Sequence, residues 1–201
     1  MRILHLEDGR FRGRRGKKVI CVMAKLPPDA EERLDLLRKT VLSGEQCVKP
    51  LHGHITIVTY LGDNRAQFIQ DCAEILRETP SFRVRYEKLE VLPETSILVA
   101  TPSKPDTLMT LHRKMKDRYS KSLDRWTCGA DWYPHTTLLY DPKADLAGLC
   151  RQMQDVFTPF ETCIRQAEFS EVKETGYTIL GTIHLMESED RTAAEEDSHT
   201  G

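Results

Sequence analysis

The sequence predicts an α+β fold with two similar lobes, and three observations support this prediction. Amphipathic helical segments alternate with short apolar strand segments, strand segments later in each half come in pairs that fit hairpins, and no glycine-rich loop follows a strand. Paired strands favour mixed or antiparallel sheets over a parallel doubly wound sheet, and the missing loop counts against a dinucleotide-binding or P-loop fold. We therefore expect two pseudo-symmetric lobes with flanking helices around a central cleft.

The first half of the chain is predicted to run from strand to helix twice and then into a strand pair. Pro27 and Pro28 mark the boundary between the first strand and the first helix, and Pro93 and Glu94 form a tight turn between the paired strands. The predicted elements are a strand at 17–26, a helix at 29–42, a strand at 54–61, a helix at 65–78 and strands at 81–92 and 95–101.

The second half repeats this arrangement without repeating the sequence. Leu108, Leu111, Met115 and Tyr119 recur at helical spacing, which predicts an amphipathic helix. The predicted elements are a helix at 106–123, a strand at 133–141, a helix at 144–157 and a hairpin of strands at 160–172 and 176–186, with its turn at Thr175 and Gly176.

Two strands at equivalent places in the halves carry the same motif, His-x-Thr. It occurs in "LHGHITIVTYLG", which begins at Leu51, and in "YPHTTLLYDP", which begins at Tyr133. Side chains alternate along a strand, so His54 and Thr56 emerge on one face with Cα atoms roughly 7 Å apart. His135 and Thr137 do the same. If the lobes face each other, two imidazoles and two hydroxyls converge on one cleft.

Such a quartet suits phosphoester chemistry. One neutral histidine takes a proton from the attacking oxygen, one protonated histidine supplies a proton to the leaving oxygen, and the threonines hydrogen-bond the phosphoryl oxygens. This chemistry requires neither a metal nor another cofactor. Roughly one His-x-Ser or His-x-Thr is expected by chance among seven histidines, so the argument depends on the matching strand context of both copies.

Neighbouring residues give further candidates. Tyr133 shares the predicted face of His135, where its ring fits a stacking contact with a nucleobase or a place at the rim of the core. His52 shares the face of His54 as a substrate-binding candidate. No His or carboxylate cluster in the sequence completes a metal site around His52 and His54. His112 is predicted on a solvated basic helix face beside Arg113 and Lys114.

Composition and charge set the remaining expectations. The 201-residue chain is 39% hydrophobic and 30% charged, and it contains no apolar run of membrane-spanning length and no signal-peptide pattern, so a cytoplasmic monomer that binds no membrane is expected. Basic residues cluster in the N-terminal arm and acidic residues in the C-terminal tail. We expect a flexible basic arm at 1–16, one bilobal domain at 17–186 and a disordered acidic tail at 187–201.

The two motifs give the chain a family resemblance. The motifs lie about eighty residues apart, and Pro134 precedes the second. With "KLPPDAEERLDLLR" as the first strand and helix, the region from about Lys17 to Met186 resembles the 2H phosphoesterase superfamily. The similarity is to its branch of LigT-like 2'-5' RNA ligases and RNA 2',3'-cyclic phosphodiesterases. One departure is Thr136, where that family usually has an aliphatic residue, and we expect it to affect packing more than chemistry.

The resemblance implies a metal-independent phosphoric diester hydrolase with an RNA end or a small nucleotide as substrate. It implies that His54 and His135 are the acid/base pair and that Thr56 and Thr137 bind the phosphate. The bonds attacked would be 2',3'-cyclic phosphates or 2'-5' linkages, and 2'-5' ligation is the reverse of such cleavage.

Several alternatives stay open at this point. The substrate is alternatively a cyclic or 2'-5' linked oligonucleotide messenger. As a further alternative, the protein is a binding module that releases a phosphate end unchanged. The sequence also leaves open which histidine is the acid and whether the product carries a 2' or a 3' phosphate.

Overall fold

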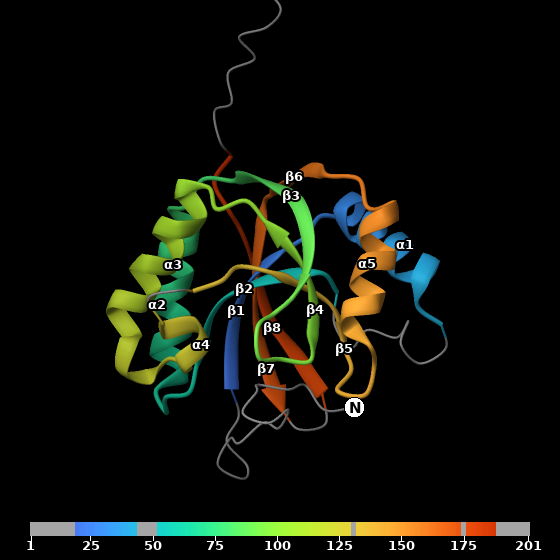
Figure 1. Ribbon diagram of the computed structural model, residues 1–201. Coiled ribbons are helices and arrows are strands. Elements are labelled where there is room, and N and C mark those ends of the chain that lie inside the picture. The colour runs from blue at the N-terminus through green and yellow to red at the C-terminus, as the bar shows by residue number, and fades with distance from the viewer. Residues whose placement is uncertain (1–18, 44–51, 130–131, 174–175, 188–201) are drawn as a thin grey trace, which may run out of the picture.

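The structure, a computed structural model, describes residues 19–43, 52–129, 132–173 and 176–187 (Figure 1). The predicted N-terminal arm, and the C-terminal tail except Glu187, lie outside these residues, as does Thr175 of the predicted last turn. The strands are β1 (Val19–Lys25), β2 (His54–Tyr60), β3 (Phe82–Val91), β4 (Ile97–Pro102), β5 (Thr136–Tyr140), β6 (Phe160–Ile164), β7 (Gln166–Lys173) and β8 (Gly176–His184). The helices are α1 (Pro28–Val41), α2 (Arg65–Arg77), α3 (Asp106–Tyr119), the 3-10 turn η2 (Ser120–Ser122), α4 (Arg125–Cys128) and α5 (Leu146–Val156).

Two four-stranded sheets form the centre of the two-lobed molecule. The first sheet has the order β2-β1-β7-β8 and the second has the order β5-β4-β3-β6. All neighbouring strands are antiparallel, which confirms the predicted α+β class. The two strands of interest, β2 and β5, occupy the corresponding edge of each sheet.

Two of the long helices, α1 and α3, are exchanged between the sheets. Helix α1 connects two strands of the first sheet but packs against α5, and Arg38 on α1 donates from Nε to the carbonyl oxygen of Leu138 on β5 at 2.7 Å. Conversely, α3 connects β4 to β5 of the second sheet but packs against α2 and β2 of the first. Figure 1 shows α2 and α3 on one side and α1 and α5 on the other. None of the described helices is long and apolar enough to cross a membrane.

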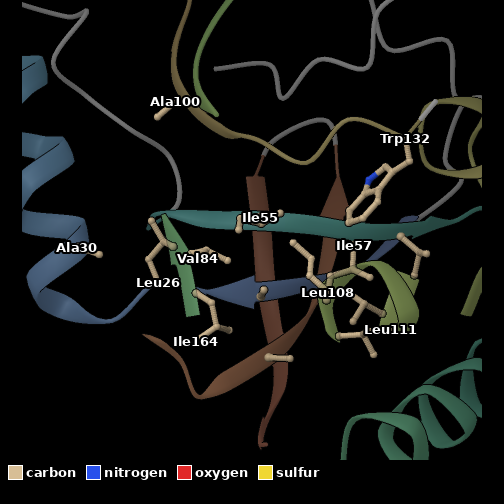
Figure 2. Close-up of a cluster of buried hydrophobic side chains, with 14 of the residues drawn as sticks. Leu26, Ala30, Ile55, Ile57, Val84, Ala100, Leu108, Leu111, Trp132 and Ile164 are labelled. Atoms are coloured by element: carbon tan, nitrogen blue, oxygen red, sulfur yellow. The ribbon is translucent and has the colours of Figure 1, made fainter. Parts of the chain in front are cut away.

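This exchange produces one contiguous core. Buried side chains from both sheets and from the packed helices form one large hydrophobic cluster, and Figure 2 shows Ile57 of β2 beside Leu108 of α3. Alternation in the central strand β1 sends Ile20, Val22 and Ala24 into this cluster. Its other face contributes Val19, Cys21 and Met23 to a second, smaller cluster.

The predicted strand at 160–172 was wrong, because the structure divides it at Arg165. Strand β6 pairs with β3 in the second sheet, whereas β7 pairs with β1 and β8 in the first. Core-facing residues alternate on each side of the break, but the phase of the alternation shifts by one residue between Ile164 and Ala167, and no glycine or proline marks the break. The chain thus crosses from one sheet to the other at this point.

The sequence did not predict α4, which covers the exposed edge of β2. The Thr59 amide of β2 donates to Thr127 Oγ1 at 3.0 Å, and the Asp124 amide donates to the Thr59 carbonyl oxygen at 2.8 Å. Edge strands have unpaired backbone groups, and covering them in this way satisfies those groups.

The prediction of a solvated His112 was also wrong. Its side chain is buried, its ring stacks on Trp132 with centroids 3.9 Å apart, and its Nε2 lies 2.7 Å from the Thr127 carbonyl oxygen. Burial lowers the pKa of His112. The basic neighbours indicated the wrong helix face, because His112 lies at helical spacing between Leu108 and Met115 and therefore on the buried face of α3.

Candidate active site

The first motif lies at the beginning of β2. His54 is partly buried and begins the strand, and Thr56 follows on the same face. The Nδ1 atom of His54 lies 2.9 Å from the carbonyl oxygen of His52. Since a carbonyl oxygen only accepts, Nδ1 carries the proton in this hydrogen bond, and Nε2 is the nitrogen that gains or loses a proton.

The second motif reproduces this arrangement. His135 directly precedes β5, and its Nδ1 lies 2.8 Å from the carbonyl oxygen of Tyr133. In each motif the histidine therefore donates to the residue two positions earlier. Both imidazoles are fixed in the same tautomer by the local backbone.

The two motif strands also share an irregularity. Val22 pairs with Val58 and Met23 with Thr56, so Ile57 is an extra residue on β2. Leu98 pairs with Leu139 and Val99 with Thr137, so Leu138 is an extra residue on β5. Each bulge lies immediately after the motif threonine, and a bulge bends a strand and increases its local twist. The predicted equivalence of the two strands thus extends to the backbone.

The structure brings the two motifs together. The Thr136 hydroxyl donates to the carbonyl oxygen of His54 at 3.0 Å and lies 2.6 Å from the Tyr86 hydroxyl. Thr136 is buried on the face opposite to Thr137, as strand alternation predicts. The departure from an aliphatic residue at this position therefore joins the two motif strands through a hydrogen bond.

The surroundings of His54 lower its pKa to about 4. Burial is the largest cause, because it disfavours the charged imidazolium, and electrostatic repulsion from the His52 and His135 rings acts in the same direction. The His52 carbonyl and the Glu168 carboxylate oppose the shift without cancelling it. His54 is therefore neutral at pH 7 in the unliganded protein.

The two motif threonines differ in exposure. Thr56 is partly buried and Thr137 is exposed. Among the residues that the structure describes, neither hydroxyl has a hydrogen-bond partner. Both are thus able to donate to an oxygen of a bound ligand.

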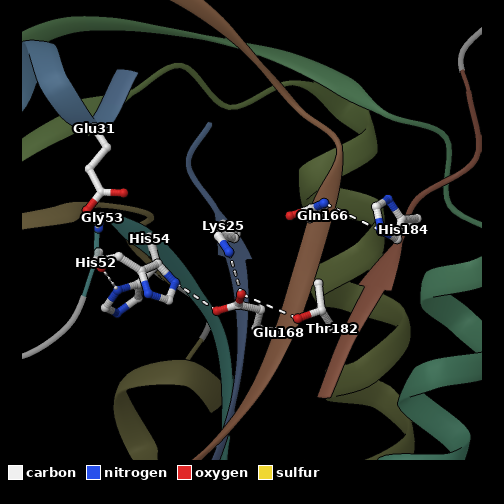
Figure 3. Close-up of polar contacts among 9 residues, drawn as sticks. All are labelled: Lys25, Glu31, His52, Gly53, His54, Gln166, Glu168, Thr182 and His184. Atoms are coloured by element: carbon white, nitrogen blue, oxygen red, sulfur yellow. Dashed lines mark hydrogen bonds and ion pairs between the residues drawn. The ribbon is translucent and has the colours of Figure 1, made fainter. Parts of the chain in front are cut away.

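The two substrate-binding candidates have partners within the protein. Nε2 of His52 lies 2.7 Å from an oxygen of Glu168 (Figure 3), and the His52 and His54 rings meet edge to face with centroids 6.2 Å apart. The Tyr133 hydroxyl donates to Glu90, while Lys104 Nζ lies 5.0 Å from the centre of the Tyr133 ring. One face of Tyr133 is therefore occupied by a cation.

Sequence reasoning missed the residues that surround these candidates. Lys25, Glu90 and Glu168 lie on strands far from the motifs in sequence, and a charged residue in an alternating strand is ordinarily a solvent-facing one. The sequence contains no signal that places them beside the histidines. Within the described ranges, no group of three or more His, Cys, Asp or Glu side chains has an arrangement that could hold a metal ion.

Comparison with known proteins identifies the family of this chain. Residues 26–175 match the family described as the 2'-5' RNA ligase superfamily. A search of curated proteins found no match to the sequence.

Solved structures with the same fold include LigT of E. coli in its apo form, which has 16% sequence identity and a TM-score of 0.62 over 85% of this chain and 98% of that chain. TT0787 of Thermus thermophilus has 16% identity and a TM-score of 0.60 over 85% of this chain and 99% of that chain. These likenesses concern the fold, whereas the family match spans three quarters of the sequence and includes both His-x-Thr strands. The chain belongs to the 2'-5' RNA ligase superfamily.

Proposed function

We propose that this protein is a metal-independent phosphodiesterase that opens 2',3'-cyclic phosphate ends of RNA or cleaves 2'-5' phosphodiester linkages. The observation that carries the proposal is the paired arrangement of His54 and His135, each anchored through Nδ1 to the backbone two residues earlier. This leaves Nε2 of each ring for proton transfer, which is what a two-histidine acid/base mechanism requires.

The lowered pKa of His54 supports the role of base for this residue and leaves the role of acid to His135. His54 is neutral at pH 7, so its Nε2 takes the proton from the attacking water as the water oxygen bonds to phosphorus. His135 donates a proton from Nε2 to the ribose oxygen as the phosphorus–oxygen bond to that oxygen breaks. The product is a phosphomonoester and a free hydroxyl, and the two histidines exchange protonation states, which solvent then restores.

Thr56 and Thr137 supply hydrogen bonds to the phosphoryl oxygens, where negative charge accumulates in the transition state. A relative with the same fold supports a phosphate or nucleotide ligand, because LigT of E. coli has been solved in complex with 3'-AMP and with phosphate. For the present protein, the binding of a phosphate or nucleotide is part of the proposal.

The test is hydrolysis of an RNA oligonucleotide with a 2',3'-cyclic phosphate end, in EDTA, by the wild type and the His54→Ala, His135→Ala double variant. We expect turnover that survives chelation and is absent from the double variant. Parallel assays with 2'-5' linked and cyclic oligonucleotides identify the preferred bond. They also test the alternative that the substrate is an oligonucleotide messenger. Saturable binding of all these substrates without turnover of any would instead identify a binding module and refute the proposal.

A further inference from the structure

The carboxylate of Glu168 on β7 connects the segment before His54 to the interior of the first sheet (Figure 3). Glu168 is 2% exposed. One of its oxygens lies 2.8 Å from Lys25 Nζ and the other 2.7 Å from His52 Nε2. His52 Nε2 and the Glu168 oxygen beside it are not aligned for a conventional hydrogen bond, and among the described residues neither of these two atoms has another hydrogen-bond partner. A buried carboxylate requires such compensation, so its position and that of His52 depend on each other.

Glu90 on β3 has the same relation to the segment before His135. Its carboxylate accepts hydrogen bonds from the hydroxyls of Tyr133 and Thr101, and Lys88 Nζ lies 3.1 Å from it. Partial burial raises the pKa of Glu90, but the Thr101, Tyr133 and Lys88 donors outweigh burial and lower it overall. The carboxylate is therefore ionised and holds the Tyr133 side chain.

Strand register shows that the two glutamates occupy equivalent positions. In the first sheet Thr56 pairs with Met23, which pairs with Glu168. In the second sheet Thr137 pairs with Val99, which pairs with Glu90. Each glutamate thus lies in the same line of cross-strand partners as a motif threonine, two strands away from it.

A bulge in β3 is needed for this equivalence. Phe82, Val84 and Tyr86 point inward, but Tyr86 pairs with Pro102 and Lys88 with Thr101, so Glu87 is an extra residue. After the bulge the alternation is reversed, and Glu90 no longer shares the core-facing side of Tyr86. Without the bulge the carboxylate would point into the core.

The segments that the glutamates hold precede the motif strands and lie outside the sheet ladders. β2 begins at His54 and β5 at Thr136, so the carbonyls of His52 and Tyr133 are not fixed by strand pairing. These carbonyls accept the Nδ1 protons of the two histidines. An anchor on the side chain of His52 or Tyr133 therefore also fixes the carbonyl that orients the ring.

We propose that Glu168 and Glu90 are equivalent positioning residues, each of which orients a motif histidine through the residue two positions before it. Neither carboxylate need touch the substrate. The consequence for turnover depends on the proposed phosphodiesterase function, but the consequence for the imidazole tautomers does not, so failure of the two proposals is distinguishable.

The direct test is nitrogen NMR of the histidine side chains at about pH 8, above the ordinary histidine pKa of about 6.5, where the imidazoles are neutral. In the wild type, His54 and His135 are expected to show a protonated Nδ1 and an unprotonated Nε2. Glu168→Gln is expected to give a mixture of tautomers at His54 alone, and Glu90→Gln at His135 alone. Wild-type tautomer signals in both variants would overturn the proposal.

Matched controls separate positioning from general loss of structure. Glu171→Gln changes another buried glutamate on β7, which is paired with Arg65 at 3.4 Å, and Glu161→Gln changes an exposed one on β6. Both controls are expected to keep wild-type tautomers. If Glu171→Gln changes the tautomers of His54 as strongly as Glu168→Gln does, the change reflects a general disturbance of the sheet, and the proposal fails.

The kinetic test uses the same variants on the cyclic-phosphate RNA. Glu168→Gln and Glu90→Gln are each expected to lower kcat by about 10-fold to 100-fold, the range for residues that orient a ligand or catalytic group from behind, with KM changed less than about 3-fold. Tyr133→Phe removes only the hydroxyl that Glu90 accepts. It should reproduce the Glu90→Gln effect, and the double variant should be no slower than either single variant.

A dominant rise in KM, or additive losses in the double variant, would overturn the proposal for Glu90. If Glu168→Gln does not fold, Glu90→Gln and Tyr133→Phe still test whether Glu90 positions His135, because the Glu90 side chain is partly exposed.

Discussion

The two motif strands have the same backbone and different surroundings. Both are sheet edges, both have a bulge after the threonine and both anchor the histidine to a carbonyl two residues earlier. Thr56 and Glu168 are nevertheless more buried than Thr137 and Glu90. The fold therefore duplicates the orientation of the motif side chains but not their burial, and this difference in burial is the basis of the proposed division into a base and an acid.

The largest effect should come from removing either imidazole. His54→Ala and His135→Ala are each expected to lower turnover by about 100-fold to 10,000-fold, the usual contribution of one general acid or base, with modest loss of binding. The pH–rate profile should lose its acidic limb in the first variant and its alkaline limb in the second. Loss of the same limb in both would contradict the division of roles, and near-wild-type turnover would remove that histidine from the mechanism.

The lowered pKa of His54 predicts that the folded protein loses stability in acid. The folded state takes up this proton only near pH 4, whereas the unfolded chain takes it up near pH 6.5. Between these values the unfolded state binds more protons, so the free energy of unfolding falls as the pH falls from about 6.5 to about 4, by up to about 3 kcal/mol.

This change is measured by urea unfolding of the wild type and His54→Gln at several pH values. The variant should lose less stability on acidification than the wild type. His184→Gln, on the exposed strand β8, is the matched control and should follow the wild type. Parallel wild-type and His54→Gln curves would show that His54 titrates normally.

The threonine hydroxyls should differ in effect between the two halves. Thr56→Val is expected to lower kcat by about 100-fold and Thr137→Val by about 10-fold, because water competes with the more exposed hydroxyl for the phosphoryl oxygen. Single-turnover kinetics on the cyclic-phosphate substrate measures both. Equal losses would mean that substrate binding excludes water equally from the two hydroxyls.

The smallest effect concerns the contact between the halves. Thr136→Val removes the hydroxyl that bonds the His54 carbonyl and leaves the buried Tyr86 hydroxyl without this partner, so the free energy of unfolding should fall by about 1 to 2 kcal/mol. Thr162→Val is the matched control, because the buried Thr162 hydroxyl has no hydrogen-bond partner among the described residues. Denaturant unfolding of both variants makes the comparison, and equal losses would show that Thr136 contributes only by its shape.

Several features were predictable because they depend on local chemistry. Pro27 and Pro28 place the start of α1 within one residue of the prediction, since proline is favoured in the first helical turn. The alternation of β-branched and apolar residues predicted β2 and the strand-like segment that contains β5. Alternation also placed His54 and Thr56 on one face.

Other features were not predictable because periodicity says which face of a strand is buried, not which sheet the strand joins. At the division between β6 and β7 the phase of the alternation shifts by one residue between Ile164 and Ala167, but such a shift does not say that the two strands join different sheets. The place of Glu90 depends on a bulge with no glycine beside it. The partner of His52 lies more than one hundred residues away along the chain.

By itself, the sequence determined the long helices, most strands and the two His-x-Thr motifs, because these follow from propensities and periodicities that act over a few residues. Only the tertiary structure decided the pairing of the sheets, the burial that lowers the pKa of His54 and the carboxylates behind each histidine. These depend on which distant segments exclude water from one another, and that becomes defined only when the two lobes pack.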